Sequence, residues 1–449
     1  MKHSIQRTRE LAWTMQHFAC ARWRWQHLHD ATLTQFQDER AQVIVNYAAR
    51  HAPFYRRHWA GHDLRDWRIL PTVDKQLMMQ NFATFNTRGI EQERALLVAL
   101  RAEQERDFRP MLADLTVGLS SGTSGHRGLF LVSPEERAGW AGVMLARALH
   151  GLRPRRLRVA FFLRSNSNLY EQIGGLLLQF RYFDLMLPLA VAVAQLNSFQ
   201  PHIIVGPPSL LGLLAQARRC GTLHAHPLRL ISVAEVLEPQ DKSALEEVFA
   251  VPVEQIYQCT EGLLAVSCAH GSLHIQEDLV VLQCEPLPDE QQTSHIQRVT
   301  PIVTDLWRKT QPIIRYRLND VLRLDPRSCS CGSAFRVIQA IEGRCDDLCY
   351  FTQHSGEVRT FFPDTIRRMI LLASAQIIDY QVVQEHRDQL HIYLAVSEQA
   401  AFAQVAEQVR ERVNAIIAQY DCRPAEVVIE EGLRPVAAGQ KRRRVQRLR

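Results

Sequence analysis

One stretch of this sequence has the composition of a phosphate cradle. GLSSGTSGHRG, at 118–128, is rich in Gly and Ser and runs directly into the apolar residues LFLV. Successive small residues let backbone N–H groups point into one concavity, and hydroxyls add donors, so the loop can wrap an anion closely. The same composition is typical of a solvated linker. The P-loop of nucleoside triphosphatases is excluded, because His126 and Arg127 follow Gly125 where that motif has Lys and then Ser or Thr.

Three later segments place carboxylates where α/β sheets gather ligands. IYQCTEG, at 256–262, brings Thr260 and Glu261 to the end of a strand-like run. PIIRYRLND, at 312–320, ends on Asp320, and EGRCDD, at 342–347, precedes a change of sequence pattern. Each segment taken alone also has a plain structural interpretation, because a Thr at a strand end is often only packed and an Asp can cap a turn.

Cysteine and histidine spacing suggests a metal site. CAHGSLH, at 268–274, separates Cys268 from His274 by five residues, and CSC supplies Cys329 and Cys331. Three sulfurs and one imidazole would close a tetrahedral zinc site of the structural type, with His270 as a competing ligand. Spacing alone leaves this site open, since C-x-C is less common than C-x-x-C. The ten cysteines are too sparse for a disulfide framework, so most of the others are expected to be buried thiols.

Length and composition describe the kind of chain that must position these groups. With 449 residues, of which 46% are hydrophobic and 22% charged, we expect a globular protein of two or three domains. The N-terminus has charges scattered through the place where a signal peptide needs an apolar run, and no run is long enough to span a bilayer. We therefore expect a cytoplasmic protein without a membrane partner. The net charge of +6 is too small to argue for nucleic acid by itself.

The pattern of apolar residues predicts an α/β fold with three parts. Residues 1–110 read as a helical lead-in that belongs to the large domain. Residues 111–345 contain strand-like runs such as RVAFFL, HIIVG and VEQIYQ, separated by helix-like stretches, which predicts mixed or parallel sheet covered by helices. Residues 346–449 restart with two strand-like runs, an amphipathic helix at 402–417 and a strand, AEVVIE, which predicts a small C-terminal α+β domain.

Taken in order, these segments resemble the adenylate-forming superfamily, in particular its phenylacetate-CoA ligase-like branch, which includes capsule-cluster and deazaflavin-adenylylating relatives. The Gly/Ser loop is similar to the phosphate loop S-S/T-G-T-T/S-G, and YQCTEG is similar to Y-G-x-T-E. RYRLND resembles R-Y-R-T-G-D, EGRCDD resembles G-R-x-D-D, and GQKRRRV resembles G-x-K-x-R-V. Each match alone is weak, but five in the right order over residues 50–449 are specific. Branch members also carry similar C-x5-H and C-x-C-G pairs, which favours the zinc site.

The resemblance implies an enzyme that uses ATP and Mg²⁺ to convert a carboxylic acid to an acyl-adenylate. We expect an aromatic acid. The acyl group would then pass to a thiol of CoA or of a carrier protein. The β- and γ-phosphates would be held by Ser121, Gly122, Thr123, Ser124 and Gly125, with Arg127 in place of the usual Lys. Thr260 would contact the α-phosphate, Glu261 would hold Mg²⁺, and Lys441 would neutralise charge as the bond forms. The nucleoside would contact Ala234, Glu235, Tyr257, Asp320 and Arg344.

The resemblance also implies a mobile small domain, with Asp346 at the hinge. Two other functions stay open at this stage. An adenylate-forming enzyme can pass AMP or the acyl group to an amine or hydroxyl, and KRRRVQRLR at the C-terminus is by default a solvated tail or a nucleic-acid patch. The sequence argues against a zinc-stabilised nucleic-acid-binding protein, because the basic run is confined to the tail. It does not decide whether the chain forms a homodimer.

Overall fold

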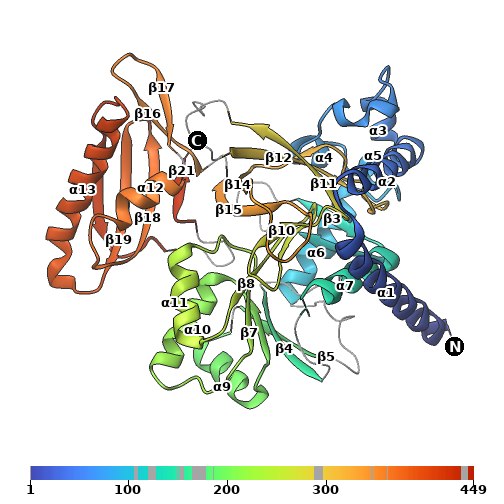
Figure 1. Ribbon diagram of the computed structural model, residues 1–449, viewed down its shortest axis with the longest axis horizontal. Helices are drawn as coiled ribbons and strands as arrows, with labels where there is room; N and C mark the ends of the chain where they lie inside the picture. The colour runs from blue at the N-terminus through green and yellow to red at the C-terminus, as the bar shows by residue number, and fades with distance from the viewer. Residues whose placement is uncertain are drawn as a thin grey trace. The chain divides into compact units, whose positions relative to one another are not determined.

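A computed structural model of the chain describes most of its residues. The described residues are 2–105, 110–119, 128–148, 150, 156–163, 178–185, 187–287, 297–344, 347–361, 363–435 and 443–448. The chain divides into two compact units (Figure 1). Unit 1 contains residues 1–284, 301–318 and 324–339, and unit 2 contains residues 285–300, 319–323 and 340–449. The domain boundary predicted at 345 and 346 lies outside the described residues, and the predicted division stays a prediction.

The N-terminal hundred residues are helical, as the spacing of their apolar residues predicts. Pro53 stands at the first turn of a helix, where its missing N–H costs no hydrogen bond. Asp74 caps another helix by accepting a hydrogen bond from the Leu77 backbone N–H at 2.8 Å. The elements are α1 (Lys2–His27), α2 (Asp30–His51), α3 (Pro53–His58), η1 (Leu64–Ile69), α4 (Lys75–Gln80), α5 (Phe82–Phe85) and α6 (Gln92–Glu105).

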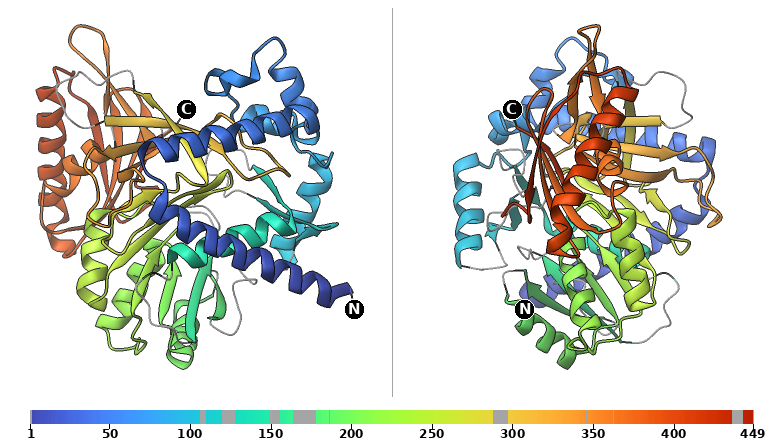
Figure 2. Two further views of the ribbon diagram at one scale, coloured as in Figure 1. Left: turned by 45° about the vertical axis from the view of Figure 1, so that its right-hand side comes forward. Right: turned by 90° about the vertical axis from the view of Figure 1, so that its left-hand side faces the viewer.

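A small antiparallel sheet follows, made of β1 (Met111–Leu112), β2 (Leu115–Leu119) and β3 (Leu129–Val132). Leu119 pairs with Leu129, so the two ends of the segment that contains the Gly/Ser loop are neighbours. Helix α7 (Pro134–Ala148) comes next and packs along α1 (Figure 2, left). The two helices approach closely at Gly142, where an added Cβ would lie 2.3 Å from the Thr14 carbonyl oxygen.

Five parallel strands form the centre of unit 1, in the order β8-β7-β6-β4-β5. Alternate residues of β4 face two different cores. Phe162 packs with residues of the helices between the strands, whereas Phe161 packs with residues of α1 and α7. Both faces are therefore covered, as parallel sheets require. The strands are β4 (Leu157–Leu163), β5 (Leu178–Asp184), β6 (Ile203–Gly206), β7 (Arg229–Ser232) and β8 (Val253–Cys259), and the helices between them are α9 (Leu189–Phe199), α10 (Pro208–Arg219) and α11 (Pro239–Phe249).

Antiparallel strands extend this sheet beyond β8 and make it mixed, as predicted. In the described part of the chain the full order is β11-β12-β14-β15-β10-β9-β8-β7-β6-β4-β5, and β13 pairs with β12. The added strands are β9 (Gly262–Ser267), β10 (Leu273–Ile275), β11 (Val280–Pro286), β12 (Gln297–Asp305), β13 (Tyr316–Arg317), β14 (Asp320–Asp325) and β15 (Val337–Arg344). The run PIIRYR, which reads as strand-like, is strand only at Tyr316 and Arg317. Its preceding residues are held instead by Tyr55, whose hydroxyl donates to the Pro312 carbonyl at 2.9 Å.

The C-terminal part of unit 2 is the predicted small α+β fold. Its mixed sheet has the order β20-β19-β18-β21, and α12 and α13 contribute buried side chains to one core (Figure 1). Val405, Val409, Val413 and Ile417 of α13 are all buried, as the amphipathic pattern predicts. The elements are β16 (Cys349–Thr352), β17 (Val358–Phe361), α12 (Pro363–Leu371), β18 (Ile377–His386), β19 (Gln389–Val396), η3 (Gln399–Ala401), α13 (Phe402–Gln419), β20 (Glu426–Glu431) and β21 (Val445–Arg447). Among the described residues, no helix is long and apolar enough to cross a membrane.

Candidate nucleotide and metal sites

Four of the predicted nucleotide contacts, Ala234, Glu235, Tyr257 and Thr260, lie at or just beyond the ends of strands at one edge of the parallel sheet. Gly206, Ser232 and Gln255 are register partners across β6, β7 and β8, so these strands end on the same side. Ala234 and Glu235 follow β7 at this edge, and Tyr257 lies near the end of β8. Ala234 takes a left-handed backbone conformation, with φ of 69°. The carboxyl ends of parallel strands are where such sheets bind ligands.

Thr260 and Glu261 form the two-residue turn between β8 and β9. The strands close around it, because Cys259 pairs with Gly262. The Thr260 hydroxyl donates to Glu261 Oε2 at 2.8 Å, and Glu261 is 8% exposed. This turn, called the Thr260–Glu261 turn below, offers carboxylate oxygen, the donor that Mg²⁺ prefers. Burial, together with the negative charge of Glu261, raises the pKa of Tyr316, so that hydroxyl stays protonated beside the carboxylate.

A second element, not expected from the sequence, holds this turn. Residues 305–308, called the 305–308 bend below, begin at the last residue of β12. The Asp305 side chain accepts hydrogen bonds from the backbone N–H groups of Trp307 and Arg308, both at 2.8 Å. Arg308 Nη1 then donates to the Thr260 carbonyl oxygen at 2.6 Å, and Nη2 to the Leu131 carbonyl oxygen at 3.4 Å. Arg308 therefore ties the Thr260–Glu261 turn to β3, the strand that follows the Gly/Ser loop.

Burial changes the acidity of Asp305. Desolvation raises its pKa to about 6, although Arg308 and the two backbone N–H donors favour the ionised form. The side chain is 7% exposed and lies under Gly262, where an added Cβ would be 3.5 Å from Oδ2. A signal for this element was present in DLWRK, which mixes an acid, an aromatic residue and two cations directly after a strand.

Two predicted nucleotide contacts belong to strands assigned at least partly to unit 2. Asp320 is the first residue of β14 and is half-buried. Arg344 is the last residue of β15, and its side chain lies outside the described part of the structure. Their predicted meeting with the Thr260–Glu261 turn stays a prediction.

Several predicted residues lie outside the described part of the chain. These are Ser121, Gly122, Thr123, Ser124, Gly125, Arg127, the hinge residue Asp346 and Lys441. Asp347, which follows the hinge residue, and Arg443, two residues after Lys441, are described, and they form an ion pair within unit 2.

The four predicted metal ligands come together in unit 1. Cys268, His274, Cys329 and Cys331 each offer a ligand atom, and these atoms all lie within 4.8 Å of one another. Cys268 Sγ is 3.8 Å from Cys329 Sγ, and Cys331 Sγ is 3.4 Å from His274 Nε2. A tetrahedral zinc ion with bonds of about 2.3 Å to sulfur and 2.0 to 2.1 Å to nitrogen holds such atoms about 3.5 to 3.8 Å apart. The arrangement, called the Cys3His cluster below, therefore fits that ion.

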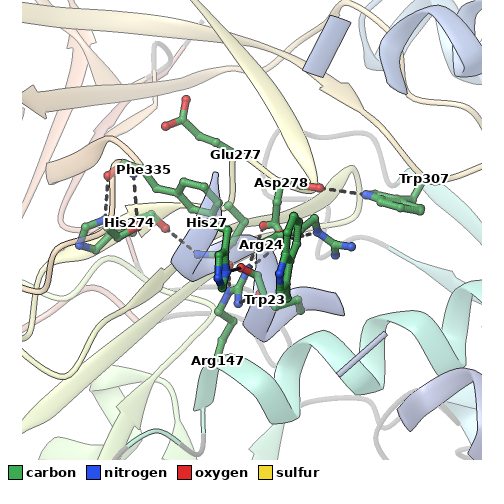
Figure 3. A network of polar contacts seen from close by, with 12 residues as sticks. Trp23, Arg24, His27, Arg147, His274, Glu277, Asp278, Trp307 and Phe335 are labelled. Atoms are coloured by element: carbon green, nitrogen blue, oxygen red, sulfur yellow. Dashed lines mark hydrogen bonds and ion pairs between the residues drawn. The ribbon is translucent and has the colours of Figure 1, made fainter. Parts of the chain in front are cut away.

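The surroundings of the cluster favour His274 over His270 as the nitrogen ligand. His274 Nδ1 lies 2.8 Å from the Phe335 carbonyl oxygen (Figure 3), a contact that leaves Nε2 directed at the sulfurs. His270 is exposed and contacts the Ser330 hydroxyl instead. The structure places His274 among the three sulfurs, and its role as a metal ligand stays a prediction.

The thiols of the cluster differ in acidity. Burial opposes ionisation of Cys329, but hydrogen bonds from Ser272, from the Cys331 backbone and from His274 bring its pKa down to about 6. Burial and the negative charge of the neighbouring sulfurs raise the pKa of Cys331 to about 12. Three thiols this close together can all lose their protons only if a positive ion offsets the repulsion between the thiolates.

Comparison with solved structures identifies the architecture. A 2-hydroxyisobutyryl-CoA ligase in its postadenylation state, in complex with an acyl-AMP, superposes with a TM-score of 0.71 at 20% sequence identity. The match covers 95% of this chain and 92% of the ligase. The chain has the fold of the adenylate-forming ligases. The same ligase in an open conformation with 2-HIB-AMP and CoA gives a TM-score of 0.59 at 20% identity, covering 91% and 90% of the two chains.

Another solved structure and one curated protein are also similar to this chain. The acyl acid amido synthetase AtGH3.15, in complex with 2,4-DB, has a TM-score of 0.59 at 12% identity and covers 93% of this chain and 92% of that one. In sequence, Protein CapK of Staphylococcus aureus is 24% identical over 212 residues. That alignment spans 46% of this chain and 45% of CapK, less than half of either protein. No family profile matches the sequence.

Proposed function

We propose that this chain uses ATP to activate a carboxylic acid as an acyl-adenylate and then transfers the acyl group to the thiol of CoA or of a carrier protein. The main support is the adenylate-forming fold over nearly the whole chain, with the Thr260–Glu261 turn and Ala234–Glu235 at one edge of its parallel strands. Aromatic acids are the substrate class we expect from the sequence. The 2-hydroxyisobutyryl-CoA ligase adds short 2-hydroxy acids to the candidates.

In the first step, a carboxylate oxygen of the acid would attack the α-phosphorus of ATP, and the bond to pyrophosphate would break. A carboxylate is already ionised at pH 7, so no general base is required. The residues must instead orient the two reactants and offset negative charge. Bound Mg²⁺ would supply charge neutralisation at the phosphates.

The residues available for this step have distinct roles in the proposal. Glu261 would hold the Mg²⁺ ion, and the Thr260 hydroxyl would reach the α-phosphate. Asp320 would accept the ribose hydroxyls, since a carboxylate has two acceptor oxygens. Lys441 would place its ammonium group between the attacking carboxylate and the α-phosphate. The loop at 121–125 and Arg127 would hold the β- and γ-phosphates.

In the second step, a thiol would attack the acyl carbonyl carbon, the bond to AMP would break, and the thiol proton would be released to solvent. The complex of the similar ligase with 2-HIB-AMP and CoA supports a thiol acceptor. The likeness to an acyl acid amido synthetase supports a second candidate, in which an amine takes the acyl group and an amide forms.

We further propose that the Cys3His cluster holds one Zn²⁺ ion with a structural role. All four ligand positions are filled by the protein, so no position is left for substrate. Cys268 follows β9, His274 lies in β10, and the two remaining ligands lie between β14 and β15. The ion would therefore fasten the β14–β15 connection to the β9–β10 hairpin.

ATP–pyrophosphate exchange across a panel of aryl, fatty and short 2-hydroxy acids tests the proposal. We expect exchange that depends on Mg²⁺ and on one class of acid, and its loss in Lys441→Ala and Asp320→Ala. Supplying CoA or an amine with the preferred acid then separates thioester from amide formation. No exchange with any acid would argue against adenylation, and steeply salt-dependent binding to nucleic acid would favour the remaining alternative.

A further inference from the structure

Asp278 is a buried carboxylate that belongs to neither proposed site. It is fully buried and accepts a hydrogen bond from Arg24 Nε at 2.9 Å. Arg147 Nη2 donates to both of its oxygens at 3.0 Å (Figure 3). Arg24 comes from α1 and Arg147 from α7, so the carboxylate joins the two helices that cover one face of the sheet. Two guanidinium groups fix one carboxylate here, a geometry that leaves it little freedom to rotate.

The backbone of Asp278 supports the 305–308 bend. Its carbonyl oxygen accepts a hydrogen bond from Trp307 Nε1 at 3.0 Å, and the Leu306 backbone N–H donates to the Leu279 carbonyl oxygen at 2.9 Å. The Trp307 ring lies 3.8 Å from the Arg40 guanidinium carbon and 5.1 Å from that of Arg24. The indole is therefore held both by its N–H group and through its ring face.

The 305–308 bend in turn holds the Thr260–Glu261 turn in place. Trp307 and Arg308 share the Asp305 carboxylate through their backbone N–H groups, so fixing one fixes the other. Arg308 reaches the Thr260 carbonyl directly. A second branch runs to the Cys3His cluster, because Arg147 Nε donates to Gln276 Oε1 at 2.7 Å and Gln276 Nε2 donates to the His274 carbonyl oxygen at 3.0 Å.

We propose that Asp278, Trp307 and Arg308 are positioning residues that fix the position of Glu261. Through Glu261 they would affect the binding of Mg²⁺ and ATP. The inference rests on the proposed function of that turn. None of the three would touch the nucleotide through the contacts described above; they act through the Thr260 carbonyl. Arg308 suits this role because its guanidinium can hold two carbonyl groups, one from the Thr260–Glu261 turn and one from β3, whereas a lysine ammonium is a point charge on a flexible stem.

The test compares Arg308→Lys with Arg229→Lys in the full chain. Arg229 is a matched control, because its buried guanidinium donates to two backbone carbonyls, those of Ala148 and His150, at 2.7 and 2.8 Å. Its remaining contact is an ion pair with Glu254 at 3.0 Å, and in the described part of the chain no hydrogen bond or ion pair joins it to the 305–308 bend. For Arg308→Lys we expect kcat of ATP–pyrophosphate exchange to fall about 10- to 100-fold. We also expect a severalfold higher Mg²⁺ concentration for half-maximal ATP binding, measured by calorimetry without acid.

Arg229→Lys should lower Tm without changing the Mg²⁺ dependence of ATP binding. Trp307→Phe provides a milder second variant, because it removes the indole N–H donor and keeps an aromatic ring, and we expect it to move the Mg²⁺ dependence in the same direction by a smaller factor. Equal Mg²⁺ dependence in the wild type, Arg308→Lys and Trp307→Phe would overturn the positioning role.

The two proposals fail in different ways. A wild-type chain that binds Mg²⁺ and ATP but exchanges pyrophosphate with no acid contradicts the proposed function, and the shift in Mg²⁺ dependence still tests the positioning role. A wild-type chain that does not bind ATP contradicts both.

Discussion

Strand β9 separates two sites that are built in different ways. The Thr260–Glu261 turn precedes its first residue, Gly262, and the Cys3His cluster begins just after its last, Ser267. The cluster consists of its own ligands, whose side chains lie within 4.8 Å of one another. The turn instead takes its position from residues far away in the sequence, above all Arg308 and the Trp307–Asp278 contact behind it. The ligands of both sites can be found from motifs, whereas the residues that hold the turn from outside cannot.

The largest effect should come from opening the cluster. In Cys329→Ser we expect the zinc content to fall from about one per chain to near zero, because a hydroxyl is a poor replacement for a thiolate ligand. Loss of a structural metal belongs to the few changes that can cost more than about 4 kcal/mol of unfolding free energy. Elemental analysis and denaturant unfolding measure the two quantities, and Cys220→Ser, at an exposed thiol outside the cluster, is the control. A folded wild-type chain without metal would remove the zinc assignment.

Changing the turn should affect chemistry more than folding. Glu261→Gln keeps the size of the side chain and an acceptor for the Thr260 hydroxyl, but removes the negative charge proposed to hold Mg²⁺. We expect ATP–pyrophosphate exchange to slow on the order of 100- to 1000-fold with little change in Tm. Raising the Mg²⁺ concentration should restore part of the rate. Exchange at the wild-type rate would show that the carboxylate is not the metal ligand.

The sequence predicts the elements and ligands of both sites better than their supports. The strand-like runs at 158–163 and 253–258, the helix at 402–417 and the Cys3His ligands are local patterns, and the structure contains all of them. Asp278 could not be found in this way. Its partners, Arg24 and Arg147, are 254 and 131 residues distant, and an isolated Asp or Arg reads as a solvated surface residue. Strand β13 is shorter than the run PIIRYR predicts for a related reason, since Pro312 accepts a hydrogen bond from the hydroxyl of Tyr55, which is 257 residues away.

A single methyl group added at Gly142 should push apart α1 and α7, the helices that carry Arg24 and Arg147. In Gly142→Ala the added Cβ would meet the Thr14 carbonyl oxygen at 2.3 Å and the Phe18 backbone nitrogen at 2.9 Å, so α1 would have to move away from α7. We expect a loss of about 3 kcal/mol in unfolding free energy, as overpacking against rigid backbone produces.

Because Arg24 and Arg147 come from these two helices, exchange activity should also fall. Gly212→Ala, in α10 with nothing within 4 Å of the added Cβ, should gain up to about 1 kcal/mol from helix propensity. Equal stabilities for the two variants would contradict the close approach of α1 and α7.

The smallest effect concerns Asp305, which joins Trp307 to Arg308 in the bend that holds the turn. Its pKa is raised to about 6 in the folded chain, above the ordinary value of 3.8 that the unfolded chain should have. The folded state therefore binds the proton more tightly. This contribution to stability is fully present below the unfolded pKa and is lost as pH rises through the folded pKa.

Asp305→Asn keeps an acceptor for the two backbone N–H groups and does not titrate. The unfolding free energy of the wild type should consequently fall relative to that of Asp305→Asn between pH 4.5 and 7, by at most about 2 kcal/mol. Urea unfolding of both chains at several pH values measures the difference. A constant difference would mean that Asp305 is solvated and that the 305–308 bend is looser than its contacts with Arg308 imply, which would weaken the contrast with the Cys3His cluster.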